Sequence, residues 1–288
     1  MRWASLAPEA TLWILTARGK RALAGRSHLC ITPSFVQKLP ICTRPNAQRE
    51  GWELYFGPYA PDYGVLSTLR VTGVAFLAAA PPADLSNEEL HTLFQNAVGY
   101  PVQLIPIRAR NWTEYEQLVR DLKENLLAGR SFDRWFDNQK RKIDKLIKVT
   151  QSISHKPTVI FIEPTSPLNI IKDWPIEIVS WSAGDYSYRG ERLSMDELLQ
   201  IDPEVIILST RGGTLKEAGE ALARWSRLPQ VQGLNAFRQK RLYAFNGIAG
   251  LFYPSPLLVS AAEGVYELLH TPAYRYNQHI GTLWAPLL

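Results

Sequence analysis

The sequence predicts an α/β protein of two Rossmann-like lobes, each with a mostly parallel sheet, joined by a single long helix. Predicted strands and helices alternate in the first third of the chain and again in its second half, and a proline-free, helix-rich segment lies between. Such alternation is typical of parallel sheets covered by helices. The 288 residues suffice for about two cores. We expect lobes over 1–108 and 157–288 and a helical connection over 109–156.

Local patterns place the elements of the first lobe. The segment 71–78 is apolar throughout, as strands buried on both faces are. Ser86 is followed three residues later by Glu89, a capping box that predicts a helix to Val98. An earlier helix is expected over 9–17. Strands are expected over 3–5, 22–25, 71–78 and 102–107, with a further one starting at 41.

The connection and the second lobe follow the same logic. Apolar positions recur at helical spacing over 111–154, and Gly129 divides this segment into two helices or bends one. Ser194 is an N-cap followed by acidic residues, which suit the first turn of a helix. Further helices are expected over 215–227 and 256–269. Strands are expected over 158–162, 177–181, 205–208 and 241–245.

Composition excludes several classes of protein. The net charge is +5, but the densest basic cluster, Lys140-Arg141-Lys142, is interleaved with apolar residues as on the solvated face of an amphipathic helix, so we expect no nucleic-acid partner. No uncharged apolar run reaches the ~18 residues of a membrane span. Cys30 and Cys42 are too few for a disulfide framework or a zinc site and are expected to be buried thiols.

The sequence shows neither the common catalytic motifs nor the pattern of an export signal. The sequence has no G-x-G-x-x-G after the first strand, no H-E-x-x-H and no G-x-S-x-G, so we expect no catalytic residue, cofactor or resident metal. Arg211-Gly212-Gly213 lacks the lysine of a phosphate loop and is interpreted as a turn that starts a helix. The first six residues run directly into Pro8 and Glu9 without an apolar core, which as written predicts a cytoplasmic chain.

Candidate ligand contacts come from residues that follow predicted strands, where open α/β sheets bind ligands, and from one aromatic loop. The segment 52–63 gathers five aromatic residues between Gly and Pro, either as cleft walls or as a loop anchored on the first lobe, and Tyr59 is the chosen contact. His28 could ligate a metal or be structural. Glu163 could bind a ligand or act as a cap. Phe252-Tyr253 precedes the last helix at another such edge.

Several motifs, in the same order, resemble the cobalamin- and ferric-siderophore-binding proteins of ABC importers, and most closely the cobalamin-binding branch. The resemblance covers about the first 45 and the last 130 residues. It rests on Ser5-Leu6-Ala7-Pro8, Gly25-Arg26-Ser27-His28, Thr43-Arg44-Pro45, Ile201-Asp202-Pro203-Glu204-Val205, Arg241-Leu242-Tyr243-Ala244-Phe245-Asn246-Gly247 and Pro254-Ser255-Pro256.

This resemblance implies a monomeric binding protein outside the cytoplasm that holds a corrinoid, ferric siderophore or haem between its lobes and delivers it to an ABC permease without a chemical step. Ser27 and His28, within the first of the matching segments, are candidate ligand contacts, and the family often places a contact at the position of Glu163. The resemblance also implies that one acidic residue on each lobe docks with the permease. Asp196 is the candidate on the second lobe. On the first lobe the equivalent position is Gly64, which has no side chain, so the nearby Asp62 is the candidate.

Two other interpretations remain open. A metal chelatase of similar fold would need a histidine and a carboxylate on opposite sides of the cleft, for which His28 and Glu163 are the candidates. The other alternative is an interaction protein that derives from a binding protein and no longer serves transport. The missing export signal and the missing first-lobe acid at Gly64 favour it.

Overall fold

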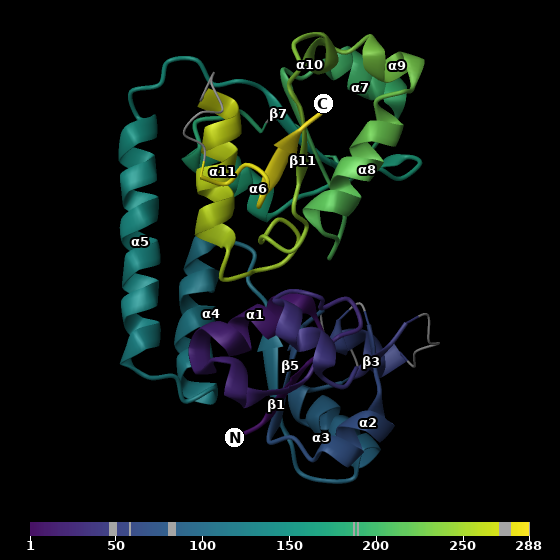
Figure 1. Cartoon of the computed structure of the whole chain (residues 1–288), viewed down its shortest axis with the longest axis vertical. Coiled ribbons are helices and arrows are strands. Elements are labelled where there is room, and N and C mark those ends of the chain that lie inside the picture. The colour runs from purple at the N-terminus through teal and green to yellow at the C-terminus, as the bar shows by residue number, and fades with distance from the viewer. Residues whose placement is uncertain are drawn as a thin grey trace. The chain divides into compact units, whose positions relative to one another are not determined.

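The computed structural model describes residues 1–45, 51–57, 59–79, 85–186, 188, 190–270 and 278–287 (Figure 1). The chain forms two compact units: Met1–Phe136 with Tyr253–Pro256, and Asp137–Phe252 with Leu257–Leu288. The chain therefore leaves the first unit once and returns to it for a short segment, Tyr253–Pro256, which we call the return segment.

The first unit contains a four-stranded, fully parallel sheet in the order β2-β1-β5-β6. All four strands confirm the sequence predictions, and their bounds are β1 (Trp3–Ser5), β2 (Leu23–Gly25), β5 (Gly73–Leu77) and β6 (Gln103–Ile107). The strand expected from residue 41 is the short β3 (Thr43–Arg44), which pairs antiparallel with β4 (Ala60–Pro61), while Ile41 forms only an isolated bridge with Arg26.

Helices cover both faces of this sheet. They are α1 (Pro8–Arg18), α2 (Tyr63–Leu69), α3 (Asn87–Val98) and α4 (Trp112–Asn125), with 3-10 turns at Lys20–Ala22, Ser34–Lys38 and Gly51–Phe56. The predicted capping box of α3 is present, since Ser86 and Glu89 exchange both of its hydrogen bonds. Val74 and Phe76 of β5 share one core cluster with Phe94 of α3, so α2 and α3 cover that face.

An aromatic cluster around Trp13 of α1 forms a second core. The Trp13 side chain is fully buried, and its ring centroid lies 5.5 Å from that of Tyr115 and 5.7 Å from that of Trp135. The indole N–H of Trp13 donates to the carbonyl of Pro254 at 3.0 Å, and the Tyr115 hydroxyl donates to the carbonyl of Ser255 at 2.9 Å. These two hydrogen bonds hold the return segment on the first unit.

The helical connection divides at the position that the sequence indicates. Helix α4 ends at Asn125 and α5 (Arg130–Thr150) begins directly after Gly129, with Leu127 of the turn in the left-handed region at φ 50°. The 21 residues of α5, about 30 Å at 1.5 Å per residue, carry the chain into the second unit. Its basic residues occupy the solvated face, as expected, while Ile143 is buried.

The second unit contains a six-stranded sheet in the order β12-β11-β10-β7-β8-β9. Strands β7, β10 and β11 are parallel and confirm the predictions, whereas the flanking pairs are antiparallel. The bounds are β7 (Val159–Glu163), β8 (Leu168–Ile170), β9 (Arg192–Leu193), β10 (Val205–Ser209), β11 (Leu242–Phe245) and β12 (Trp284–Pro286). The sequence analysis missed β8, β9 and β12, which are too short to show a period.

The helices of the second unit correct one expectation. They are α6 (Trp174–Trp181), α7 (Met195–Ile201), α8 (Leu215–Trp225), α9 (Pro229–Gln232), α10 (Asn235–Arg238) and α11 (Leu258–His270). The segment 177–181, expected as a strand from its β-branched residues, is the end of α6. Pro175 lies in the first turn of this helix, and Trp174 and Ile178, four residues apart, are buried on the same side.

Both cysteines are buried free thiols, as the sequence predicts. Burial raises the pKa of the Cys42 thiol to about 12 and also raises that of Cys30, so neither forms the reactive thiolate readily. We expect a colorimetric thiol reagent at about pH 8 to leave both cysteines of the native protein unmodified and to label both after denaturation. Rapid stoichiometric labelling of native protein would contradict the burial.

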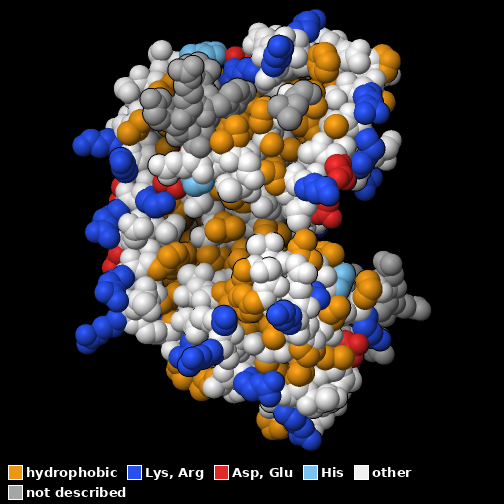
Figure 2. All heavy atoms as spheres, viewed as in Figure 1, with side chains coloured by type: hydrophobic (Ala, Val, Ile, Leu, Met, Phe, Trp, Pro, Cys, Tyr) orange, Lys and Arg blue, Asp and Glu red, His pale blue; other side chains and the backbone are white. Residues whose placement is uncertain are grey.

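No helix among the described residues is long and apolar enough to cross a membrane. On the face shown in Figure 2, lysine and arginine side chains are scattered and do not gather into one patch.

Candidate functional site

The residues that follow β2 form a hydrogen-bonded cluster at the carboxyl end of the first sheet. The backbone N–H of His28 donates to the Thr43 hydroxyl oxygen at 2.9 Å, and the Nδ1 atom of His28 lies 2.7 Å from the same oxygen. The imidazole also contacts the ring of Tyr59, edge to face, with centroids 5.1 Å apart. The structure therefore brings together two residues, His28 and Tyr59, that the sequence analysis selected separately.

Ser27 determines the direction of the hydrogen bonds in this cluster. Its side chain is fully buried, and the Thr43 hydroxyl donates to its Oγ at 3.5 Å. With that hydrogen directed at Ser27, the Thr43 oxygen accepts Nδ1–H of His28, and the lone pair of the imidazole is on Nε2. Burial, and then the nearby Arg26 charge, lower the pKa of His28 and keep it neutral at pH 7.

The guanidinium group of Arg26 holds the loop that presents His28. It is buried and donates to the carbonyls of Ser27 at 3.0 Å, His28 at 3.3 Å, Cys30 at 3.2 Å and Gln37 at 3.5 Å. A tight loop has few backbone partners for its carbonyls, and one buried guanidinium replaces them here.

Gly57 allows the aromatic segment to pass close to the end of β5. Its φ is +90°, and a Cβ atom there would lie 2.5 Å from the carbonyl oxygen of Leu77. Before this glycine, Phe56 is buried in the core, and after it Tyr59 is half-buried beside His28. Part of the segment therefore anchors the loop on the first unit, while Tyr59 as a ligand contact stays a prediction.

A cavity of about 410 Å³ lies at the carboxyl ends of β5 and β6. Tyr55, Ala79 and Arg108 line it, together with Glu114 and Asp121 of α4. Sequence reasoning missed it, although Arg108 directly follows a predicted strand and had the same positional signal as His28.

In the second unit, a chain of contacts links Glu163 to Phe252. Glu163 ends β7; one carboxylate oxygen accepts from the Asn169 amide at 3.0 Å and the other from the Arg211 backbone N–H at 3.1 Å. The Arg211 guanidinium lies over the Phe252 ring, 5.3 Å from its centroid. Arg211 also precedes α8, which confirms the predicted turn. Tyr253, half-exposed, begins the return segment of the first unit.

The two predicted docking acids differ in their surroundings. Asp196 is exposed in the first turn of α7. Asp62 is half-buried, and its carboxylate caps α2 by accepting the backbone N–H of Val65 at 3.0 Å. The described residues contain no group of three or more His, Cys, Asp or Glu side chains placed to hold a metal ion.

Comparison with known proteins defines the class of fold. No protein-family model matches the chain, and no curated protein matches its sequence. Among solved structures, however, the match extends over nearly the whole chain, and the protein has the two-lobed α/β fold of ABC-importer substrate-binding proteins.

Three of these structures give the detail. A periplasmic haem-binding protein from Pseudomonas aeruginosa has a TM-score of 0.72 at 15% identity, with 100% of this chain and 98% of that chain covered. The haem-binding protein HutB of Vibrio cholerae has a TM-score of 0.69 at 15% identity, covering 94% and 99%. The vitamin B12-binding protein BtuF of Vibrio cholerae has a TM-score of 0.64 at 18% identity, covering 93% and 95%. The fold implied by the sequence resemblance is confirmed.

Proposed function

We propose that this chain is a substrate-binding protein of an ABC-type importer and that it binds a haem or a corrinoid. The observation that carries the proposal is the His28–Tyr59 pair at the carboxyl end of the first sheet, with the His28 imidazole neutral and its Nδ1 engaged by Thr43. The fold and the haem- and B12-binding neighbours support it.

The chemistry of the pair favours a flat macrocycle over a ferric siderophore. Haem and corrinoids carry a metal with an axial position that a neutral imidazole fills, and both offer a wide face to aromatic side chains. A siderophore surrounds its iron with oxygen atoms and leaves less for His28 to bind.

The proposal includes no chemical step. Both carboxylate oxygens of Glu163, the acid that a chelatase would need, already accept hydrogen bonds from Asn169 and Arg211 of their own unit. Glu163 therefore fits a role in holding the Arg211 turn better than one as a general base. For delivery of the ligand to a permease, the exposed Asp196 is the more accessible docking acid, since the Asp62 carboxylate is engaged as a helix cap.

Titration of the purified protein with hemin, cyanocobalamin and ferrichrome, followed by absorbance, tests this proposal. We expect saturable binding of hemin or cyanocobalamin. Tyr59→Ala should weaken that binding about tenfold through loss of the aromatic contact. His28→Gln should abolish the spectral signature of imidazole ligation.

Tyr266→Ala is the matched control, because it removes a half-exposed ring from α11, away from the carboxyl ends of the strands. It should leave the affinity unchanged. Binding of ferrichrome alone, or equal losses of affinity in the Tyr59 and Tyr266 variants, would refute the assignment.

A further inference from the structure

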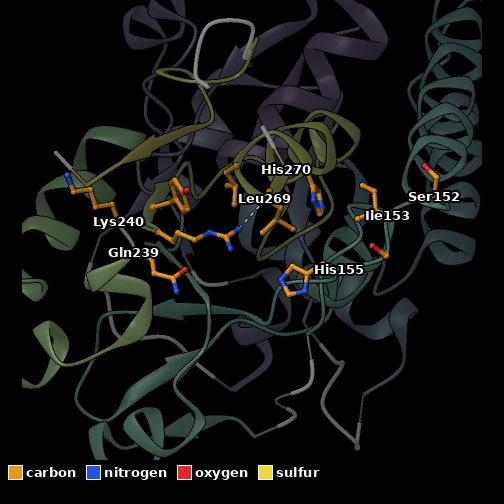
Figure 3. Close-up of a pocket in the computed structure, with 11 residues that line it drawn as sticks. Ser152, Ile153, His155, Gln239, Lys240, Leu269 and His270 are labelled. Carbon is orange, nitrogen blue, oxygen red and sulfur yellow. Dashed lines mark hydrogen bonds between the residues drawn. The ribbon is translucent and has the colours of Figure 1, made fainter. Parts of the chain in front are cut away.

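A second cavity, of about 690 Å³, lies at the amino ends of the parallel strands of the second sheet (Figure 3). Its lining comes from residues 152–155 before β7, residues 239–241 and 243 at the start of β11, and residues 268–270 at the end of α11. Glu163 lies at the carboxyl end of β7, and the cavity lies at the amino end of the same strand. The five residues of β7 separate these two ends by about 15 Å. This cavity is therefore distinct from the candidate site described above.

Basic groups dominate the polar part of this cavity. His155, Arg241 and His270 line it, and Figure 3 shows the rings of His155 and His270 on the same side of it, with the Lys240 side chain pointing away from them. The Arg241 guanidinium donates to the carbonyl of Leu269 at 3.1 Å, and His270 Nε2 donates to the carbonyl of Ser182 at 2.8 Å. These two bonds fix both side chains without neutralising them.

Glu204, just before β10, is the acidic partner of this group. Its carboxylate lies 3.0 Å from His155 Nε2 and 3.8 Å from Arg241. Burial alone would raise the pKa of Glu204, but the Thr158 amide, His155 and Arg241 together hold that pKa below its usual value. Glu204 is thus ionised at neutral pH and is paired with His155 and Arg241.

The floor of the cavity is apolar. Tyr243, Leu268 and Leu269 line it, and each is less than a tenth exposed. A space of this size, with an apolar floor and a few converging polar groups, is typical of a small-molecule site.

We propose that this cavity binds a small organic anion, with its carboxylate or phosphate between Arg241, His155 and His270 and its apolar body against Tyr243 and Leu269. The site goes beyond the proposed transport ligand and does not depend on it. Arg241 supplies a permanent charge, and His270 adds charge as the pH falls. Burial, chiefly, lowers the pKa of His270, so its charge appears only in mild acid.

Calorimetric titration with benzoate and with phenyl phosphate, in the absence of macrocycle, tests the site. Benzyl alcohol supplies the apolar body without the charge, and inorganic phosphate supplies the charge alone. We expect benzoate or phenyl phosphate to bind saturably and more tightly than either fragment. Benzoate affinity should rise between about pH 7.5 and about pH 5.5, because His270 becomes protonated while benzoate stays ionised.

Three variants separate the contributions. Arg241→Gln should weaken binding about tenfold. His270→Gln should flatten the pH dependence. His155→Gln keeps a hydrogen-bond donor for Glu204 and should weaken binding, with little change in Tm because the His155 side chain is 72% exposed. Lys216→Gln and His91→Gln, which remove a cation and an imidazole outside the cavity, are the controls and should bind as the unaltered protein does.

Absence of saturable binding by both benzoate and phenyl phosphate would overturn the proposal. So would equal affinities in the His155→Gln and His91→Gln proteins together with an unchanged pH profile in the His270→Gln protein. Neither result bears on the macrocycle titration, which probes the carboxyl ends of the strands.

Discussion

Replacing Arg26 with methionine is expected to lower the free energy of unfolding by about 3 kcal/mol and to abolish ligand binding at His28. The buried guanidinium donates to four backbone carbonyls, those of Ser27, His28, Cys30 and Gln37. Methionine has nearly the length of arginine but no donors, so these carbonyls lose their partner and the loop that presents His28 loses its shape. Urea denaturation measures the first effect and the macrocycle titration the second.

Arg26→Lys is the matched variant, because it retains the charge but offers one ammonium group in place of a planar fork. It should recover part of the stability and little of the binding, since a single ammonium cannot reach carbonyls spread from Ser27 to Gln37. A lysine variant with full binding would show that the charge of Arg26, and not its geometry, sustains the loop.

Sequence reasoning succeeded where the determining interaction is local. The box between Ser86 and Glu89 spans three residues, and the parallel strands of both sheets are short apolar runs bounded by polar or turn residues. The division at Gly129 also depends on local propensity. In 177–181 local reasoning failed, because β-branched composition was weighed above the helix start that Pro175 signals from the first turn.

The candidate site shows the complementary limit. His28 was selected by its position after a strand and Tyr59 from the aromatic segment 52–63. Thr43, which fixes the imidazole, lies fifteen residues from His28 and entered only as part of a motif of the family resemblance. Arg211 reaches Glu163 across 48 residues, and its stacking on Phe252 depends on how the second sheet folds. The position of a residue at a strand end is readable from sequence, whereas its partner is set by tertiary packing.

Truncating Trp13 to alanine is expected to destabilise the first unit by about 4 kcal/mol. Trp13 is fully buried, and its indole fills the space between Tyr115 and Trp135, so the truncation leaves a large cavity in a close-packed core. It also removes the donor to the Pro254 carbonyl. Thermal or urea denaturation, followed by near-UV circular dichroism, measures the loss.

Trp13→Phe separates packing from hydrogen bonding. It retains most of the ring and loses only the N–H to Pro254, so it should cost about 1–2 kcal/mol. The return segment makes the distinction useful, because Pro254 follows Tyr253, a candidate ligand contact. If the indole N–H is what anchors that segment, Trp13→Phe weakens macrocycle binding more than its small stability loss explains. If Tyr115, through its bond to Ser255, anchors the segment alone, Trp13→Phe binds normally and Tyr115→Phe does not.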